Sequence, residues 1–192
     1  MKKILLIAAL ALATLIPAQA ASVLPLFLDE VIDTASVAFE GTCVANRSER
    51  EAATGLVVTY TTFAVQDVLK GDAPTTHVIK QIGGSLPGEE LQYRVQGIPT
   101  FTVGESYVVF LAGVSKAGFS SPIGLGQGRF AVRAAGGARQ VTNGRDFKDL
   151  TKRMAARVPA KAKARMDGSE PVREMDLDEF KQMVRGHVGG AR

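Results

Sequence analysis

Several stretches between residues 36 and 133 alternate apolar and polar positions with the two-residue period of β-strands. The longest such run extends from Leu56 to Leu69 and is rich in Val, Thr, Tyr and Phe. It predicts a strand longer than the usual five or six residues. Further strands are predicted at residues 36–45, 77–82, 107–112 and 128–133. Five strands that do not alternate with helices predict a small antiparallel sheet.

The longest predicted strand has to bend. Both faces of the run 56–69 mix apolar and polar side chains, so we expect a twist or bulge midway that changes which face points inward. Gly41 stands inside the first predicted strand, where a glycine permits a bend. A closed five-stranded barrel needs such strands, because they belong to both of its halves. We therefore expect a mainly β chain with an OB-type antiparallel barrel at residues 21–140, and a small open β-sandwich is the alternative.

The apolar period changes to that of a helix near both ends of the chain. Helices are predicted at residues 24–35, 145–157 and 176–186. Asp176 is expected to cap the last helix and Gly186 to end it. The basic stretch 156–171 between the last two is interpreted as a linker. Residues 141–192 thus form a predicted basic, helical C-terminal extension.

Two polar stretches lie between the predicted strands and are interpreted as loops. One is residues 46–55 and the other is the glycine-rich stretch 81–99, QIGGSLPGEELQYRVQGIP. Long ordered loops on a rigid barrel commonly carry binding functions. The candidate binding residues are Gln81, Gly83, Gly84, Ser85 and Arg94. The alternative is that the two adjacent glycines only turn the chain.

The first 20 residues have the three parts of a signal peptide. Lys2 and Lys3 provide positive charge, Ile4–Ile16 is almost wholly apolar, and Ala18-Gln19-Ala20 matches the cleavage pattern. The apolar run is shorter than the roughly 20 residues that span a bilayer. We therefore expect cleavage after Ala20, no membrane span afterwards, and a location in the periplasm or outside the cell.

Charge and cysteine content limit which partners and which sources of stability the sequence supports. The formal net charge is +4, and removal of Lys2 and Lys3 leaves +2, which is weak support for a polyanionic partner. We expect no nucleic-acid partner. The basic excess lies in residues 141–192, where the run 148–165 either contacts an anionic surface or is a solvated helix face and linker. A single cysteine cannot form an intramolecular disulfide, so stability rests on the apolar core.

The chain offers little catalytic chemistry. Cys43 could act as a nucleophile only beside a base, and the only histidines are His77 on the third predicted strand and His187 in the C-terminal tail. Cys43 shares a strand face with apolar neighbours, so the simpler interpretation is a buried, unreactive side chain. No histidine or cysteine stands at metal-ligand spacing. The sequence GLGQG at 124–128 precedes a strand, which favours a turn over a phosphate loop. No metal, cofactor or catalytic residue is predicted.

Three segments carry a resemblance to a known family. They are ASVAFEGTCVA (35–45), VVTYTTFAVQDVLKG (57–71) and FTVGESYVVFLAG (101–113). In this order they resemble the netrin-like, or tissue-inhibitor-of-metalloproteinase-like, OB domain. With QIGG, GLGQGRF and LDEF, the chain is also similar over residues 35–185 to uncharacterised bacterial exported proteins, which accompany exported zinc proteases in some genomes. The animal inhibitors chelate the protease zinc through an N-terminal cysteine, which this chain does not have at Ala21.

The resemblance and the residues together predict an exported, non-enzymatic binding module. The expected partner is another exported protein, with a zinc protease as the named candidate, contacted through the loops 46–55 and 81–99. One alternative is a protein that binds cell-envelope glycans or other polyanions through its basic segment. The other alternative is an enzyme that acts on envelope material.

Overall fold

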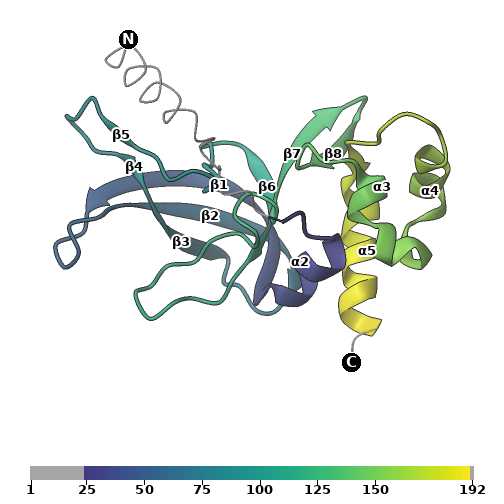
Figure 1. Ribbon diagram of the computed structural model, residues 1–192, viewed down its shortest axis with the longest axis horizontal. Helices are drawn as coiled ribbons and strands as arrows, with labels where there is room; N and C mark the ends of the chain where they lie inside the picture. Colours follow the sequence, from purple (N-terminus) through teal and green to yellow (C-terminus); the bar gives the residue numbers. More distant parts are fainter. Residues whose placement is uncertain (1–23, 191–192) are drawn as a thin grey trace, which may run out of the picture.

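The computed structural model describes residues 24–190. The predicted signal peptide at residues 1–20 lies outside the described residues. Figure 1 shows helices gathered at one end of a large antiparallel sheet and two hairpins projecting at the other end. Among the helices of residues 24–190, none is long and apolar enough to cross a membrane.

The sheet contains seven strands in the order β3-β2-β1-β6-β7-β8-β9. The strands are β1 (Val37–Arg50), β2 (Val57–Lys70), β3 (Thr76–Ile82), β6 (Ser106–Leu111), β7 (Arg129–Ala135), β8 (Ala138–Thr142) and β9 (Met175–Asp176). A separate two-stranded ribbon pairs β4 (Gly84–Ser85) with β5 (Gln92–Tyr93). All pairings are antiparallel. The prediction of a mainly β chain is confirmed.

The predicted five-stranded closed barrel is not found in residues 24–190. The edge strands β3 and β9 have no strand pairing with each other, and β8 and β9 raise the strand number above five. The two extra strands are short, and β8 forms because the chain reverses at Gly136–Gly137, both with positive φ, after β7. Loop 113–122 runs beside the β3 edge, where the N–H of Ser120 donates to the carbonyl of Lys80.

The two longest strands, β1 and β2, form a bent ribbon. Their register shifts at Ala38/Phe39, Glu40/Gly41 and Cys43/Ala45, which confirms the expected bulges. A side chain at Gly41 would lie 3.1 Å from the carbonyl oxygen of Ala64, so glycine also permits the close approach of the strands. The prediction of a loop at residues 46–55 is partly wrong, because residues 46–50 continue β1. Asn46 and Ser48 of this extension are paired with the polar Thr61 and Thr59 of β2, so the alternation of hydropathy that marks a strand is absent.

Helices occupy both ends of the described chain. They are α2 (Leu28–Thr34), α3 (Phe147–Leu150), the 3-10 helix η1 (Lys152–Arg157), α4 (Ala160–Met166) and α5 (Leu177–Gly190). The predicted linker 156–171 is wrong in part, since it contains α4. Asp176 caps α5 as predicted, because its Oδ1 accepts from the N–H groups of Asp178 and Glu179. The predicted stop at Gly186 is wrong, and α5 continues while Val188 still packs against the core.

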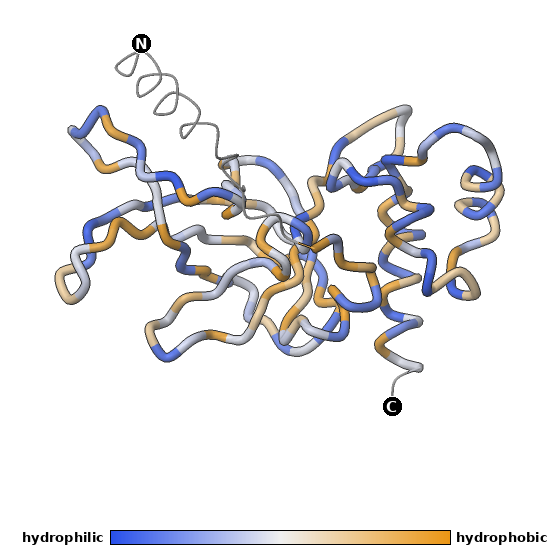
Figure 2. The backbone as a smooth tube through the Cα atoms, viewed as in Figure 1, coloured by the Kyte–Doolittle hydropathy of each residue, from blue (hydrophilic) through white to orange (hydrophobic). Residues whose placement is uncertain are grey.

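The sheet separates two apolar cores. The helix-side core lies between the sheet and the helices and includes Ile32, Phe110, Phe130, Phe147, Phe180 and Val184. The strand-side core lies on the other face and includes Phe39, Cys43, Phe63, Ile79, Phe101 and Tyr107. Strand β6 contributes to both, which is why Tyr107 to Leu111 are all buried. Figure 2 shows hydrophobic positions along the central strands and interleaved with hydrophilic positions in α5.

The C-terminal residues share the helix-side core with the strands. Phe130 of β7 packs against Phe180 of α5, with ring centroids 4.9 Å apart. The boundary predicted between residues 140 and 141 falls inside β8. The helical segment 141–190 therefore completes the core that covers one face of the sheet.

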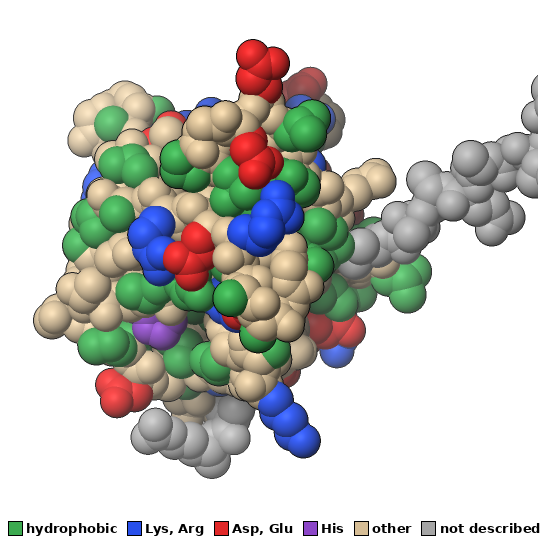
Figure 3. Space-filling view, turned by 90° about the vertical axis from the view of Figure 1, so that its left-hand side faces the viewer, with side chains coloured by type: hydrophobic (Ala, Val, Ile, Leu, Met, Phe, Trp, Pro, Cys, Tyr) green, Lys and Arg blue, Asp and Glu red, His purple; other side chains and the backbone are tan. Residues whose placement is uncertain are grey.

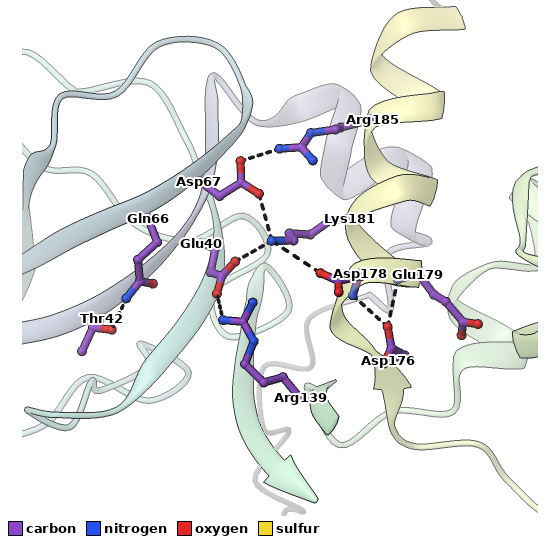
Figure 4. A network of polar contacts seen from close by, with 10 residues as sticks. All are labelled: Glu40, Thr42, Gln66, Asp67, Arg139, Asp176, Asp178, Glu179, Lys181 and Arg185. Atoms are coloured by element: carbon purple, nitrogen blue, oxygen red, sulfur yellow. Dashed lines mark hydrogen bonds and ion pairs between the residues drawn. The ribbon is translucent and has the colours of Figure 1, made fainter. Parts of the chain in front are cut away.

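A buried ion-pair network joins α5 to the sheet (Figure 4). Lys181 Nζ lies 2.7 Å from Glu40 Oε2 and 2.9 Å from Asp67 Oδ2. Arg139 of β8 approaches the other oxygen of Glu40 at 2.6 Å. The Glu40 side chain is only 2% exposed. Burial alone lowers the pKa of Lys181, but its hydrogen bonds to Glu40 and Asp67 and their charges raise the pKa above its ordinary value.

We expect Lys181→Met to lower the free energy of unfolding by about 3 kcal/mol or more, because it leaves the buried Glu40 carboxylate without its principal partner. The matched control is Arg185→Met, one turn along α5, where the half-exposed guanidinium contacts Asp67. This change should cost less than about 1 kcal/mol. Urea unfolding followed by circular dichroism measures both, and equal losses in the two variants would contradict the role given to Lys181.

Candidate binding cleft

A cleft of about 850 Å³ opens at the end of the sheet opposite the helices. Its floor comes from the distal halves of β1 and β2 and the end of β3, and the ribbon β4–β5 and the segment 94–101 form its walls. Figure 3 looks onto this end of the molecule, where basic and acidic side chains lie among apolar and uncharged ones. A volume of this size is within the usual range of ligand pockets.

The floor of the cleft continues the strand-side core but changes from apolar to polar. Thr61 Oγ1 donates to Asn46 Oδ1 at 2.8 Å, and Asn46 Nδ2 donates to the carbonyl of Phe101 at 2.7 Å. One register step outward, the hydroxyls of Ser48 and Thr59 lie 2.9 Å apart. These hydrogen bonds hold the floor in one arrangement before any ligand arrives.

Two lining residues have spare hydrogen-bond donors. Gln81 at the end of β3 is 4% exposed, and its Nε2 has no hydrogen-bond partner. The buried Nε of Arg129, at the start of β7, also has none. The Arg129 guanidinium stacks on the rings of Tyr107 and Phe101, at 4.8 Å and 5.7 Å from their centroids. Buried donors normally have partners, and these two belong to residues that line the cleft.

The wall formed by β4 and β5 is held close to the floor. Arg50 at the end of β1 donates to the Tyr93 hydroxyl at 2.9 Å and stacks on the same ring. Gly83 and Gly84 both have positive φ, and a side chain at Gly84 would collide with Ser48 and Thr59. The two glycines therefore turn the chain and also allow it to cross the ribbon closely.

The structure brings all five sequence-predicted binding residues together on the cleft. They are Gln81, Gly83, Gly84, Ser85 and Arg94. The sequence did not single out Arg129, which is 35 positions further along the chain than Arg94. Its only local signal was the position after the glycine-rich turn GLGQG. That sequence is a turn, as predicted, with positive φ at Gly124 and at the non-glycine residue Leu125.

Among residues 24–190, three arginines and no acidic residue, histidine or cysteine line the cleft. Arg47 pairs with Glu49 and stacks on Tyr60, and Arg94 donates from Nε to Gln92. No hydrogen bond or ion pair of the Arg129 side chain is found among the described residues. Of the three lining arginines, Arg94 and Arg129 have no acidic partner among the described residues.

The residues considered for catalysis do not come together. Cys43 is fully buried in the strand-side core, and its long contacts are to Ala45 and Asn46. Burial raises the pKa of its thiol. His77 lies against the ring of Phe39, and burial lowers its pKa. His187 is not in a loose tail, because it belongs to α5 and its Nε2 lies 2.7 Å from Asp33.

We expect native Cys43 to react with a thiol reagent at least about 100-fold more slowly than in urea, since labelling requires opening of the core. Stopped-flow labelling at pH 8 checks this, with the unfolded protein as the reference. Rapid labelling of the native protein would show that the thiol is accessible and would reopen a catalytic role.

The raised thiol pKa predicts a loss of stability in mildly alkaline solution. Above about pH 8.5 the unfolded chain releases the thiol proton while the native protein retains it, so the free energy of unfolding falls as pH rises toward the native pKa. Urea unfolding between pH 7.5 and 9.5 should show this decline, and Cys43→Ala should reduce it. An identical decline in both proteins would assign it to other groups.

Comparison with known proteins adds no assignment. No family model, curated protein or solved structure matched the chain. In the part of the chain from 24 to 190, no group of three or more His, Cys, Asp or Glu residues could hold a metal ion. The candidate site therefore rests on the cleft itself.

Proposed function

We propose that this protein is an exported, non-enzymatic binding module that holds a segment of another exported protein in the cleft. The observation that carries the proposal is the cleft of about 850 Å³ with its polar floor, lined in part by Gln81 and Arg129, each of which has a buried donor without a partner among the described residues. A preformed concave site with a few directed polar groups is the usual form of a binding site.

The resemblance to the netrin-like OB domain suggests the kind of partner. An exported zinc protease is the candidate, and a netrin-like arrangement of the strands β1, β2, β3, β6 and β7 is the finer fold proposed. Contact occurs through residues 46–55 and 81–99. The bond from Arg50 to Tyr93 supports this, because it holds these two segments together at one end of the molecule.

The two alternatives have weaker support. For polyanion binding, part of the basic segment is engaged internally, since Arg153 lies 2.9 Å from Asp29 and 2.7 Å from Glu30. For an envelope-acting enzyme, the lining of the cleft supplies none of the Asp, Glu, His or Cys side chains that most often act as acid, base or nucleophile. Binding through the cleft accounts for its geometry with fewer assumptions.

We expect Ser85→Trp to abolish retention of the exported partner, because Ser85 is exposed on the cleft wall and an indole there occupies the space. The control is Thr75→Trp, an exposed position in the turn between β2 and β3 that does not line the cleft. The partner is isolated by co-purification from envelope and medium fractions, and direct binding is then measured with the purified pair. Equal binding by wild type and Ser85→Trp would contradict the proposal.

The same assay tests the route of contact. Extension of the expected mature N-terminus at Ala21 should leave binding nearly unchanged, because the cleft lies on the β1–β2 and β4–β5 hairpins. If N-terminal extension abolishes binding while Ser85→Trp has no effect, the protein binds through an N-terminal wedge. Retention on anionic polymers that weakens as salt rises, and that is lost when the exposed Lys152, Lys161 and Lys163 are replaced by Gln, would favour the polyanion alternative.

A further inference from the structure

The surroundings of the Arg129 side chain suggest which chemical group the cleft binds. Its guanidinium is half buried and stacked on Tyr107 and Phe101, and its buried Nε has no hydrogen-bond partner. No carboxylate lies within ion-pair distance among residues 24–190. Arginine presents its donors as a planar fork that matches a carboxylate, and stacking on two aromatic rings holds that fork in a fixed orientation. An arginine held this way without an acidic partner is suited to receive one from a ligand.

Gln81 gives a second, independent indication that the cleft lacks a hydrogen-bond acceptor. It is 4% exposed, and its Nε2 donor is unpaired. Other polar side chains of the floor, Asn46, Thr61 and Ser48, satisfy one another or the backbone. The floor therefore lacks an acceptor at Gln81, and a ligand oxygen would supply it.

The free edge of β1 suggests that the ligand is an extended chain. Beyond Cys43, which bonds Glu105 and Gly104, β1 pairs only with β2 in the described residues. Asn46, Arg47 and Ser48 of this edge border the cleft. An unpaired strand edge offers backbone donors and acceptors at the repeat of a polypeptide, and proteins use such edges to bind extended peptides.

We propose that the cleft binds an extended peptide segment and that Arg129 receives a carboxylate of that segment. The carboxylate is either the terminal one or that of an Asp or Glu side chain. Gln81 donates to the same carboxylate or to a neighbouring carbonyl, and Arg94 at the rim adds positive charge. The inference rests on the proposed function and adds to it the chemistry of the recognised segment.

The probe is a phage library of random peptides with free carboxyl termini, selected on the wild-type protein in the presence of competing Ser85→Trp protein. Enriched peptides are synthesised with a fluorophore, and their affinity is measured by fluorescence polarisation. Each is compared with its C-terminal amide and with versions that carry Asn for Asp or Gln for Glu. The change that weakens binding identifies which carboxylate is bound.

Arg129→Gln should weaken binding of the carboxylate peptide by about tenfold or more, because a charge-assisted hydrogen bond is lost. It should not weaken binding of the neutralised peptide further, since both changes remove the same interaction. The matched control is Arg133→Gln, an exposed position on the same strand β7, which should bind like wild type.

Two more variants keep the test valid if Arg129→Gln is poorly folded. Arg129→Lys retains the charge but loses the planar fork, and it should bind more weakly than wild type. Gln81→Glu has nearly the same shape and places a negative charge beside the ligand carboxylate, so we expect about a tenfold loss or more. Circular dichroism confirms the folded state of each variant before binding is compared.

The inference is wrong if neutralised peptides bind as well as their acidic forms, if Arg129→Gln binds like Arg133→Gln, or if no peptide is enriched. When Ser85→Trp blocks the exported partner but the Arg129 and Gln81 variants bind it normally, the proposed function stands and only the carboxylate inference fails. When Ser85→Trp also leaves partner binding unchanged, both fail.

Discussion

The buried carboxylate of Glu40 is the constraint on which the arrangement of sheet and helices depends. It lies on β1 next to the bulge at Gly41 and needs compensation, because an isolated charge in the interior is very unfavourable. Lys181 comes from α5, some 140 positions later, and Arg139 comes from β8. Satisfying one carboxylate thus fixes the position of the C-terminal helix against the sheet. Removing one partner of such a buried pair is strongly destabilising, because it leaves the other charge without compensation.

The sheet can hold two cores because its central strands are buried on both faces. The helix-side core needs the C-terminal residues, since Phe147 and Phe180 cover Phe130 and Phe110. The strand-side core is closed by Phe101 from the segment before β6, and its aromatic rings meet edge to face at 4.9 and 5.1 Å. At the distal end of β1 and β2 this second core ends and its inner face becomes polar. The binding cleft is therefore the open end of a core.

At the distal end of β1 and β2, a rigid hydrogen-bonded floor lies beneath the cleft. The hydroxyl and amide groups of Asn46, Thr61, Ser48 and Thr59 bond one another, so the floor is preorganised. The side chains of Arg129 and Gln81 are placed by packing, and yet Arg129 Nε and Gln81 Nε2 have no hydrogen-bond partner among the described residues. A site whose own groups are fixed binds its ligand with a smaller loss of conformational entropy. The cleft thus combines fixed geometry with unmet hydrogen-bonding capacity, which is the physical basis of the proposed recognition.

Periodicity alone was sufficient to place β1, β2, β3, β6 and β7 and the apolar stripe of α5, because burial of one face imposes a regular pattern. Glycine content and polarity, rather than periodicity, singled out residues 81–99, which form the β4–β5 ribbon and part of the cleft wall. Periodicity could not show that residues 46–50 extend β1, where the inward face is polar and the alternation disappears. Nor could it reveal β9, α4 or the pairing of Glu40 with Lys181, which depend on contacts between distant segments. Arg129 became a candidate only in three dimensions, because its stacking, its unpaired donor and its position beside Gln81 result from how β7 packs against the rest of the sheet.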